Sequence, residues 1–544
     1  MKLSELLLAG KFSELTSYFS NAYLYFFLPA CIAVYSLMPK RAKKYFLLAA
    51  SMIFFWLISG KLILFLLFTI LSVHHFALWL DRINTQKSLT LKETEKENKK
   101  EVKKLFQKKS RLVLGFAVVI HIGALLAIKY SPFFTGNVNS LLKFFGSSLV
   151  LEIPKIVMPI GISFFTLQAV SYLVDVYRGV VPADENIFRL ALFVSFFPQI
   201  VEGPICRYGQ TADELWNVKK IDYQNLLLGL TRILYGYMKK LVVADRLNPL
   251  VCELFDNYEN YSGPMLAFGA LCYTVQLYMD FSGTMDAVIG TARIFGVTMP
   301  ENFARPFFSK SISEFWQRWH ITLGTWFKDY IFYPVTMSKP MKNLTSSARK
   351  KLGNHFGPLI AGAIALFCVW FSNGLWHGAA WSYIFFGMYH FALILLGNVF
   401  SPLSKTVCEK LRLSKDNAAF CVFQILRTGA LVVLGEMFFR ANGLRAGLSM
   451  FKIMLTNIKF VPLTKETLTP LGVDVLDLLI VLVTVMIVFV VGVMREKGID
   501  VQKTVCEKNT AVRWAVLYAL IMFIVVFGAY GPGYIPVDPM YAEF

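Results

Sequence analysis

The sequence has little of what a soluble protein needs. Charged residues make up only 17% of its 544 residues, whereas 56% are hydrophobic. Its mean hydropathy of +0.54 is far too apolar for a soluble domain. Runs of about ten residues with alternating polarity, which mark a membrane β-barrel, do not occur either. The composition therefore indicates an α-helical membrane protein.

Clusters of cysteine and histidine are also absent. The eight cysteines are scattered, mostly in apolar stretches, and none belongs to a CxxC motif. In this setting they are typical of small buried hydrophobic residues. The sequence therefore predicts neither a disulfide framework nor a zinc or other metal site.

The chain has few acidic residues, and its formal net charge is +20. Such a charge is often found in nucleic-acid-binding proteins, but here the positive residues gather in short loops between apolar runs. That placement is typical of orientation signals in membrane proteins. We therefore expect no nucleic-acid partner.

Apolar runs long enough to cross a bilayer as a helix recur along the chain. They cover approximately 21–38, 45–59, 62–80, 112–130, 156–177, 187–206, 223–243, 264–282, 357–372, 379–398, 417–438, 472–494 and 512–530. The sequence therefore predicts an all-α polytopic membrane protein with roughly 11–14 crossings. We expect a single domain over 1–544, with a motif-bearing core at 156–398.

Charge placement predicts the orientation of these crossings. By the positive-inside rule, the basic segments lie in the cytoplasm, which puts both termini outside. These segments are 39–44, 81–111, 339–351, 403–415 and 495–508. Segment 81–111 holds eleven Lys/Arg against five Asp/Glu and reads as a solvated helix or loop. Residues 1–20 show no cleavable signal peptide and are expected to lie on the membrane. The placement of 180–310 stays open.

A histidine stands out in the short break between the apolar runs 357–372 and 380–398. His377 is the only ionisable residue in Phe371–Trp381, where Gly374 and Gly378 permit close approach of the backbone. An imidazole at membrane depth is costly to keep and can exchange a proton near neutral pH. Two interpretations remain open: a general base that activates a hydroxyl, or a histidine packed at a helix interface.

A second histidine lies in an aromatic-rich stretch at 311–335. Ser311 and Glu314 have capping-box spacing, and Pro334 helps to end the predicted helix. His320 falls with Trp316 on its apolar face, which is typical of a helix at the membrane interface. A packed histidine and a catalytic one are again the alternatives.

Two polar stretches interrupt other apolar runs. Gln168, Ser171 and Asp175 recur at helical spacing and predict a polar stripe that faces protein or a water-filled path. Asp280 and Asp286 flank Ser282. We expect a structural ion pair for Asp286, with Arg293 or Arg305, and leave the role of Asp280 open.

Several of these motifs occur in the order found in one known family. Asp280-Phe-Ser-Gly, Pro300-Glu-Asn-Phe303, Ser313-Glu-Phe-Trp-Gln-Arg-Trp-His320 and Trp376-His377-Gly resemble the membrane-bound O-acyltransferase family. The likeness is greater to its bacterial polysaccharide branch, which includes the alginate O-acetylase membrane subunit and the teichoic-acid D-alanyl transferase. Further matching segments are Pro159–Gly179, Gly435–Ala441 and Tyr530–Phe544.

The resemblance implies a ring of tilted helices around a tunnel, with His377 and His320 as the two family histidines. We expect the tunnel or substrate site to include Trp316, Trp319, Asp280, Ser282, Asn373, Trp376 and Gln168. It also implies acyl transfer from a cytoplasmic thioester to an acceptor on the outer side of the plasma membrane. No bound cofactor is expected, because the thioester (acetyl-CoA or an acyl carrier protein) is already activated.

In the predicted mechanism, His377 is the base, while His320, indole N–H or backbone N–H groups stabilise the oxyanion. Basic residues, among them Lys239, Lys240 and Lys342, would attract the phosphates of the donor. The acyl group, expected to be acetyl, passes to a polysaccharide or cell-wall hydroxyl, directly or through an extracytoplasmic partner transferase. The alternatives are D-alanyl transfer to teichoic acid, acylation of a lipid or protein, and a polytopic transporter for a glycan or solute.

Overall fold

The computed structural model describes residues 18–154, 156–411 and 417–530, and most of them lie in helices. In these ranges the only strand-like pairing is one isolated bridge, between Phe303 and Trp319. Seven helical stretches of the same ranges are long and apolar enough to cross a membrane. The predicted all-helical, polytopic fold is thus confirmed, while the total number of crossings stays a prediction. The expected lead-in over 1–20 and the motif ending at Phe544 lie mostly outside the described residues.

The chain divides into two units. The first contains the described residues up to Ile233 together with Ala287–Pro300. The second contains Leu234–Asp286 and the described residues from Glu301 onward. Two helices, α9 (Tyr223–Tyr237) and α11 (Gly263–Ile294), contribute residues to both units.

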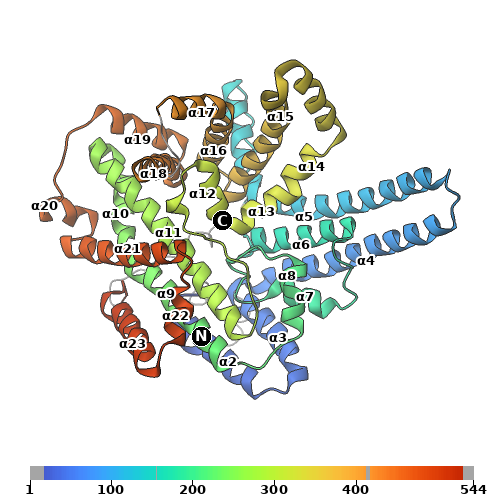
Figure 1. Cartoon of the computed structure of the whole chain (residues 1–544), viewed down its shortest axis with the longest axis horizontal. Helices are drawn as coiled ribbons and strands as arrows, with labels where there is room; N and C mark the ends of the chain where they lie inside the picture. Colours follow the sequence, from blue (N-terminus) through green and yellow to red (C-terminus); the bar gives the residue numbers. More distant parts are fainter. Residues whose placement is uncertain (1–17, 155, 412–416, 531–544) are drawn as a thin grey trace. The chain divides into compact units, whose positions relative to one another are not determined.

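The first unit is built around two long neighbouring helices, α4 and α5, drawn in blue in Figure 1. Its other elements are η2 (Ala22–Phe27), α2 (Leu28–Leu37), α3 (Lys40–Ser59), η3 (Gly60–Leu62), α6 (Ile162–Arg178), α7 (Ile187–Ser195) and α8 (Tyr208–Trp216). Helix α4 spans Ile63–Glu93 and α5 spans Lys99–Phe144, so the predicted polar segment 81–111 is largely exposed helix. The expected short outer segment 131–155 is instead helical as far as Phe144.

One predicted span of this unit is wrong. Helix α7 has only nine residues, and the chain from Phe196 to Arg207 is irregular. Pro198, Gly203 and Pro204 explain the break, because proline lacks the N–H that continues a helix. The polar stripe of α6 behaves as predicted, since Gln168, Ser171 and Asp175 are all buried.

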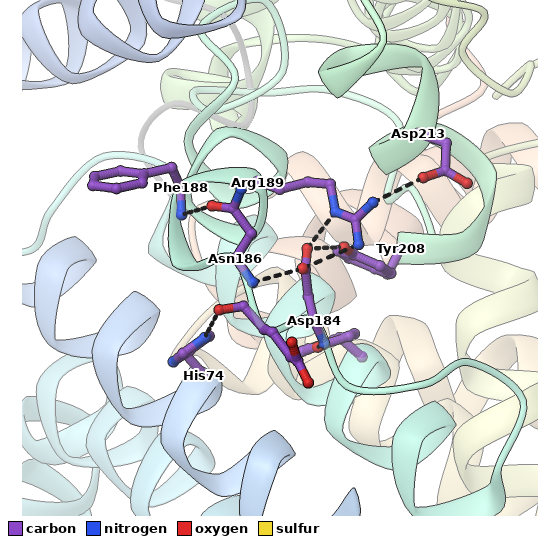
Figure 2. A network of polar contacts seen from close by, with 9 residues as sticks. His74, Asp184, Asn186, Phe188, Arg189, Tyr208 and Asp213 are labelled. Atoms are coloured by element: carbon purple, nitrogen blue, oxygen red, sulfur yellow. Dashed lines mark hydrogen bonds and ion pairs between the residues drawn. The ribbon is translucent and has the colours of Figure 1, made fainter.

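A polar network fixes the loop between α6 and α7, as Figure 2 shows. The buried Asp184 carboxylate accepts hydrogen bonds from Arg189 (Nε, 2.6 Å) and from the Tyr208 hydroxyl. Arg189 also reaches the exposed Asp213 at 3.3 Å. The Asn186 side chain caps α7 by accepting the Phe188 backbone N–H at 3.0 Å. Burial alone would raise the pKa of Asp184, but these donors lower it below its ordinary value of 3.8.

The second unit begins within α9, at Leu234, and continues through a wide helical turn, η4 (Met238–Ala244). Then follow α10 (Asp245–Asp256), η5 (Tyr258–Asn260) and most of α11. Next come η6 (Pro306–Phe308), α12 (Ile312–Arg318), α13 (Ile321–Phe327), η7 (Lys328–Phe332), α14 (Tyr333–Thr336), α15 (Lys339–His377), α16 (Trp381–Val399), α17 (Ser401–Lys410), α18 (Ala418–Arg440) and α19 (Leu444–Thr456). The described part ends with α20 (Lys465–Leu468), η8 (Thr469–Leu471), α21 (Val475–Glu496), α22 (Val501–Glu507) and α23 (Thr510–Phe527). Five predicted spans correspond to α15, α16, α18, α21 and α23.

Candidate active site

His377 is the last residue of α15 and precedes the three-residue turn that leads into α16. The two helices pack closely, as Figure 1 shows. A Cβ on Gly378 would lie 2.3 Å from the Tyr383 ring, and one on Gly374 would lie 2.6 Å from the Tyr383 carbonyl oxygen. Glycine is therefore required at both positions. The predicted break is confirmed, and it buries the His377 side chain at the end of the helix pair.

His320 lies in a break that the sequence did not predict. The predicted start of the helix is confirmed, because Ser311 accepts the Glu314 N–H and Glu314 pairs with Arg318 at 2.8 Å. The helix nevertheless ends at Arg318 instead of continuing past His320. His320 has φ +46° and ψ +50°, a left-handed conformation that is uncommon for residues other than glycine. The expectation of one continuous interfacial helix is therefore wrong.

The reason is a backbone pairing with the segment at 302–304. The Ala304 N–H donates to the Arg318 carbonyl at 2.9 Å, and the Ile321 N–H donates to the Asn302 carbonyl at 3.0 Å. These two bonds draw the chain out of helical geometry between α12 and α13. The strained conformation is held by its surroundings, which is a common property of functional positions.

The Asn302 side chain fixes the proton of the His320 ring. Its Oδ1 accepts the Thr322 backbone N–H at 3.1 Å and lies 3.2 Å from His320 Nδ1. A backbone N–H can only donate, so the Asn302 atom at this point is the oxygen, and Nδ1 of His320 carries the proton. Burial lowers the pKa of His320 to about 3. The ring is therefore neutral near pH 7 and presents a lone pair on Nε2.

Trp376 brings the two histidines together. Its ring centroid lies 5.6 Å from that of His320 and 5.0 Å from that of His377. Both imidazoles meet the indole edge-to-face, at interplanar angles of 65° and 78°. Two histidines from distant parts of the sequence thus contact the same aromatic side chain, and all three side chains are buried.

A third histidine near this indole, the buried His390 on α16, was missed by the sequence reasoning. The indole N–H of Trp316 donates to His390 Nδ1 at 3.2 Å, which places the proton of a neutral His390 on Nε2. The ring of Phe386 contacts both His390, at 4.7 Å, and His377, at 6.0 Å. His390 lies about two turns into an apolar helix, where a histidine is usually an ordinary core residue. No local signal in the sequence therefore distinguished it.

The other predicted site residues fall into different places. Asn373 lies one turn before His377 and is buried, and its Oδ1 has no hydrogen-bond partner among the described residues. Trp319 packs against Phe303, with ring centroids 5.1 Å apart. Gln168 belongs to α6 of the first unit. Their roles in substrate binding stay predictions.

Asp280 and Ser282 belong to a buried ion network between η4 and α11. Lys240 pairs with Asp280 at 2.7 Å and with Asp245 at 3.0 Å. Lys239 pairs with Asp286 at 2.7 Å and donates to Ser282 Oγ at 3.2 Å. Phe281, between the two partners, contacts the His320 ring at 4.8 Å. The network therefore supports the wall against which His320 packs.

This network corrects two expectations. Lys239 and Lys240 are buried and paired with carboxylates, so the prediction that they attract donor phosphates is wrong. Asp286 forms a structural ion pair as predicted, but its partner is Lys239 and not Arg293 or Arg305. Within 18–154, 156–411 and 417–530, no three His, Cys, Asp or Glu side chains group closely enough to hold a metal ion.

The chain is thus a polytopic helical membrane protein in which two buried histidines contact one indole. The family model described as the membrane-bound O-acyltransferase family matches residues 178–427, which include both histidines. The chain is also 32% identical to a probable alginate O-acetylase, AlgI, of Azotobacter vinelandii, over 86% of this chain and 84% of that protein.

Two further relatives are named for other acceptors or another acyl group than the alginate O-acetylase. The peptidoglycan O-acetyltransferase of Helicobacter pylori is 30% identical over 65% of this chain and 67% of that protein. The teichoic acid D-alanyltransferase of Bacillus subtilis is 32% identical over 45% of this chain and 60% of that protein. The chain belongs to the membrane-bound O-acyltransferase family and is an acyltransferase, so the transporter alternative no longer applies.

Proposed function

We propose that the protein moves an acetyl group from a cytoplasmic thioester to a hydroxyl of an extracytoplasmic polysaccharide, directly or through a partner transferase in the cell envelope. The observation that carries this proposal is the convergence of His320 and His377 on Trp376. The relatives support the acyl group and acceptor class, because several are named O-acetylases of polysaccharides.

His377 acts as the general base. It takes the proton from the acceptor hydroxyl while the hydroxyl oxygen bonds to the thioester carbonyl carbon. The carbon–sulfur bond then breaks, and the departing thiolate takes the proton from the imidazolium, which restores the neutral ring. A base in this role contributes on the order of 10²–10⁴ to the rate.

His320 is better suited to accept a hydrogen bond than to donate one. Its proton is held on Nδ1 toward Asn302, and its ring is neutral. It therefore orients the acceptor hydroxyl or a neighbouring donor, and stabilisation of the oxyanion falls to indole or backbone N–H groups. The buried aromatic surroundings limit hydrolysis of the thioester by excluding bulk water.

The predicted cytoplasmic face, where the thioester donor would arrive, carries basic residues other than the buried Lys239 and Lys240. Lys342, Arg349 and Lys350 at the start of α15 are exposed. They lie in a segment predicted to be cytoplasmic, ahead of the break at Gly353 that divides α15, whereas His377 ends the part of α15 that follows the break. The positive charges of this surface attract the negative phosphate groups of a coenzyme A or acyl-carrier donor and so steer it toward the protein.

The test is the ester-linked acetate on surface glycans of cells that express the intact protein, His377→Ala or His355→Ala at equal levels. His355 is an exposed histidine of the same helix and serves as the matched control. We expect acetate with the intact and control proteins and none above background with His377→Ala. Acetate with His377→Ala would make His377 structural.

If none of the three proteins adds acetate, the acetyl proposal is wrong. D-alanyl esters would then be measured on the same cells, because two teichoic acid D-alanyltransferases are among the relatives. D-alanyl ester with the intact protein but not with His377→Ala would establish that alternative.

A further inference from the structure

Helix α18 carries a buried carboxyl group that the mechanism above does not use. Glu436 is only 2% exposed, and its carboxyl group forms no hydrogen bond or ion pair with the described residues. Arg440, one turn later, is at pairing distance in sequence but engages Asp256 at 3.7 Å instead. An ionisable group kept in this state at membrane depth is costly and is by default a candidate for function.

The same face of α18 lies against the histidine cluster. Phe439, three residues after Glu436, has its ring 5.1 Å from His377 and 4.9 Å from Tyr383. A Cβ on Gly435 would lie 2.8 Å from His390 Nε2. Glu436 is therefore flanked in sequence by two residues that contact the buried histidines or the space beside them.

Other polar groups lie near the Glu436 carboxyl. Glu436 and Tyr383 both act electrostatically on the phenol of Tyr273 in α11. The Tyr383 ring also lies where a Cβ of Gly378 would be, directly after His377. Tyr383 thus borders the position after His377 and shares a neighbour, Tyr273, with Glu436.

Helix direction places this group on the predicted acceptor side. The basic segment 339–351 precedes the break at Gly353, after which α15 runs on to His377. In the sequence, the basic segment 403–415 separates the end of α16 from the start of α18. His377, Tyr383 and Glu436 lie toward the other ends of these helices. If the basic segments are cytoplasmic, as the positive-inside rule predicts, Glu436 is closer to the outer face, where the acceptor arrives.

We propose that Glu436 binds the carbohydrate acceptor by accepting a hydrogen bond from one of its hydroxyl groups, which positions a hydroxyl beside His377. This inference rests on the proposed function in its direct form, in which the carbohydrate itself is the acceptor at His377. A single carboxyl group among aromatic rings suits a polyol, because it forms hydrogen bonds with hydroxyl groups while the rings exclude water. A purely structural role fits poorly, since the carboxyl group pairs with no side chain in the described part of the chain.

The test compares Glu436→Gln and Glu436→Met with Glu409→Gln, which changes an exposed glutamate of α17. Two quantities are measured: ester acetate on surface glycans in cells, and the melting temperature of each purified protein in detergent. We expect both Glu436 variants to lower the acetate by about tenfold, as the loss of one hydrogen bond predicts. Their melting temperatures should equal or exceed that of the intact protein, because a buried ionisable group is removed.

A kinetic measurement uses acetyl-CoA as donor and glycerol as the acceptor probe. Glu436→Gln should raise the KM for glycerol more than the KM for acetyl-CoA. Acetate within twofold of the intact level in both variants would overturn the proposal, as would a melting temperature that falls together with the acetate. Absence of acetate with the intact protein itself would be a failure of the proposed function and is recognised by that measurement alone.

Discussion

The Oδ1 atom of Asn302 lies 3.2 Å from Nδ1 of His320 and also accepts the Thr322 backbone N–H. One amide oxygen therefore sets both the tautomer of a site histidine and the turn that follows it. The Ile321 N–H, which donates to the Asn302 carbonyl, strengthens the same junction. His320 thus depends on a residue eighteen positions earlier for its geometry.

Replacing Asn302 should therefore disable the site without touching a histidine. Asn302→Ala frees the His320 ring to turn and to exchange its tautomer, and we expect kcat to fall on the order of 10²-fold, within the range for loss of acid–base assistance. Acetyl-CoA turnover by the purified protein measures this. Asn343→Ala, at an exposed amide in α15, is the control and should be unchanged. If Asn302→Ala were as active as the intact protein, the tautomer of His320 would not matter for catalysis.

The hydrogen bond between Trp316 and His390 should contribute to stability. His390→Phe leaves the partly buried indole N–H of Trp316 without an acceptor, which costs about 1 kcal/mol in the free energy of unfolding. Trp316→Phe removes the donor, so the double variant should lose less than the sum of the two single losses. Thermal unfolding of the intact protein, the two single variants and the double variant in the same detergent completes this double-mutant cycle. Strict additivity would mean that the bond contributes nothing.

The Asp184 network should make stability depend on acid. Its lowered pKa means that the folded state binds fewer protons than the unfolded state near pH 3–4, so stability rises with pH there. The contribution is present above the ordinary pKa of 3.8 and is lost as the pH falls through the lowered value. Melting temperatures measured between pH 3 and 7.5 should show this loss.

Arg189→Gln tests whether the guanidinium of Arg189 causes this pH dependence. It leaves the Asp184 carboxylate buried without its guanidinium, and the cost at pH 7 is about 2–3 kcal/mol after allowance for partial exposure of Arg189. Without that partner, burial raises the pKa of Asp184, so the deficit should shrink as the pH falls. Arg349→Gln, at an exposed arginine, is the control. A deficit independent of pH would assign the loss to packing.

The two groups of basic residues should respond differently to substitution. Lys240→Met leaves Asp245 and Asp280 buried without their cation, so we expect a loss of about 3–5 kcal/mol in stability. Neutralising the exposed Lys342, Arg349 and Lys350 should leave stability nearly unchanged and raise the KM for acetyl-CoA, with the effect disappearing in high salt. A raised donor KM in a stable Lys240→Met protein would contradict the structural role of the network.

Helix identity was predictable in most of the chain because length, hydropathy and caps are local properties. The spans that correspond to α15 and α16, the glycine-rich break after His377 and the Ser311 cap follow from such signals. The break at His320 does not, because it depends on hydrogen bonds to the distant segment at 302–304. The ion pairs of Lys239 and Lys240 likewise join helices about forty residues apart, and neither lysine differs in sequence from an orientation signal.

The site was predictable to a similar extent. His320 and His377 were found because an imidazole in apolar sequence is rare, and motif order supported both. His390 was missed because an isolated histidine within a continuous helix is typical of core. Glu436 was noted only as part of a matching segment, since its lack of a partner becomes visible only when Arg440 is seen to engage Asp256.

The wide turn η4 limits which changes of sequence length the chain tolerates. Lys239 and Lys240 are adjacent, yet each meets a different carboxylate on α11, and the turn between Met238 and Ala244 sets the direction of both side chains. Removing one residue from this turn would return it to ordinary helical winding and rotate one lysine away from its aspartate. Deletions at 238–244 should therefore be far more damaging than conservative replacements, and the spacing between Tyr237 and Asp245 is as much a part of the structure as the charges themselves.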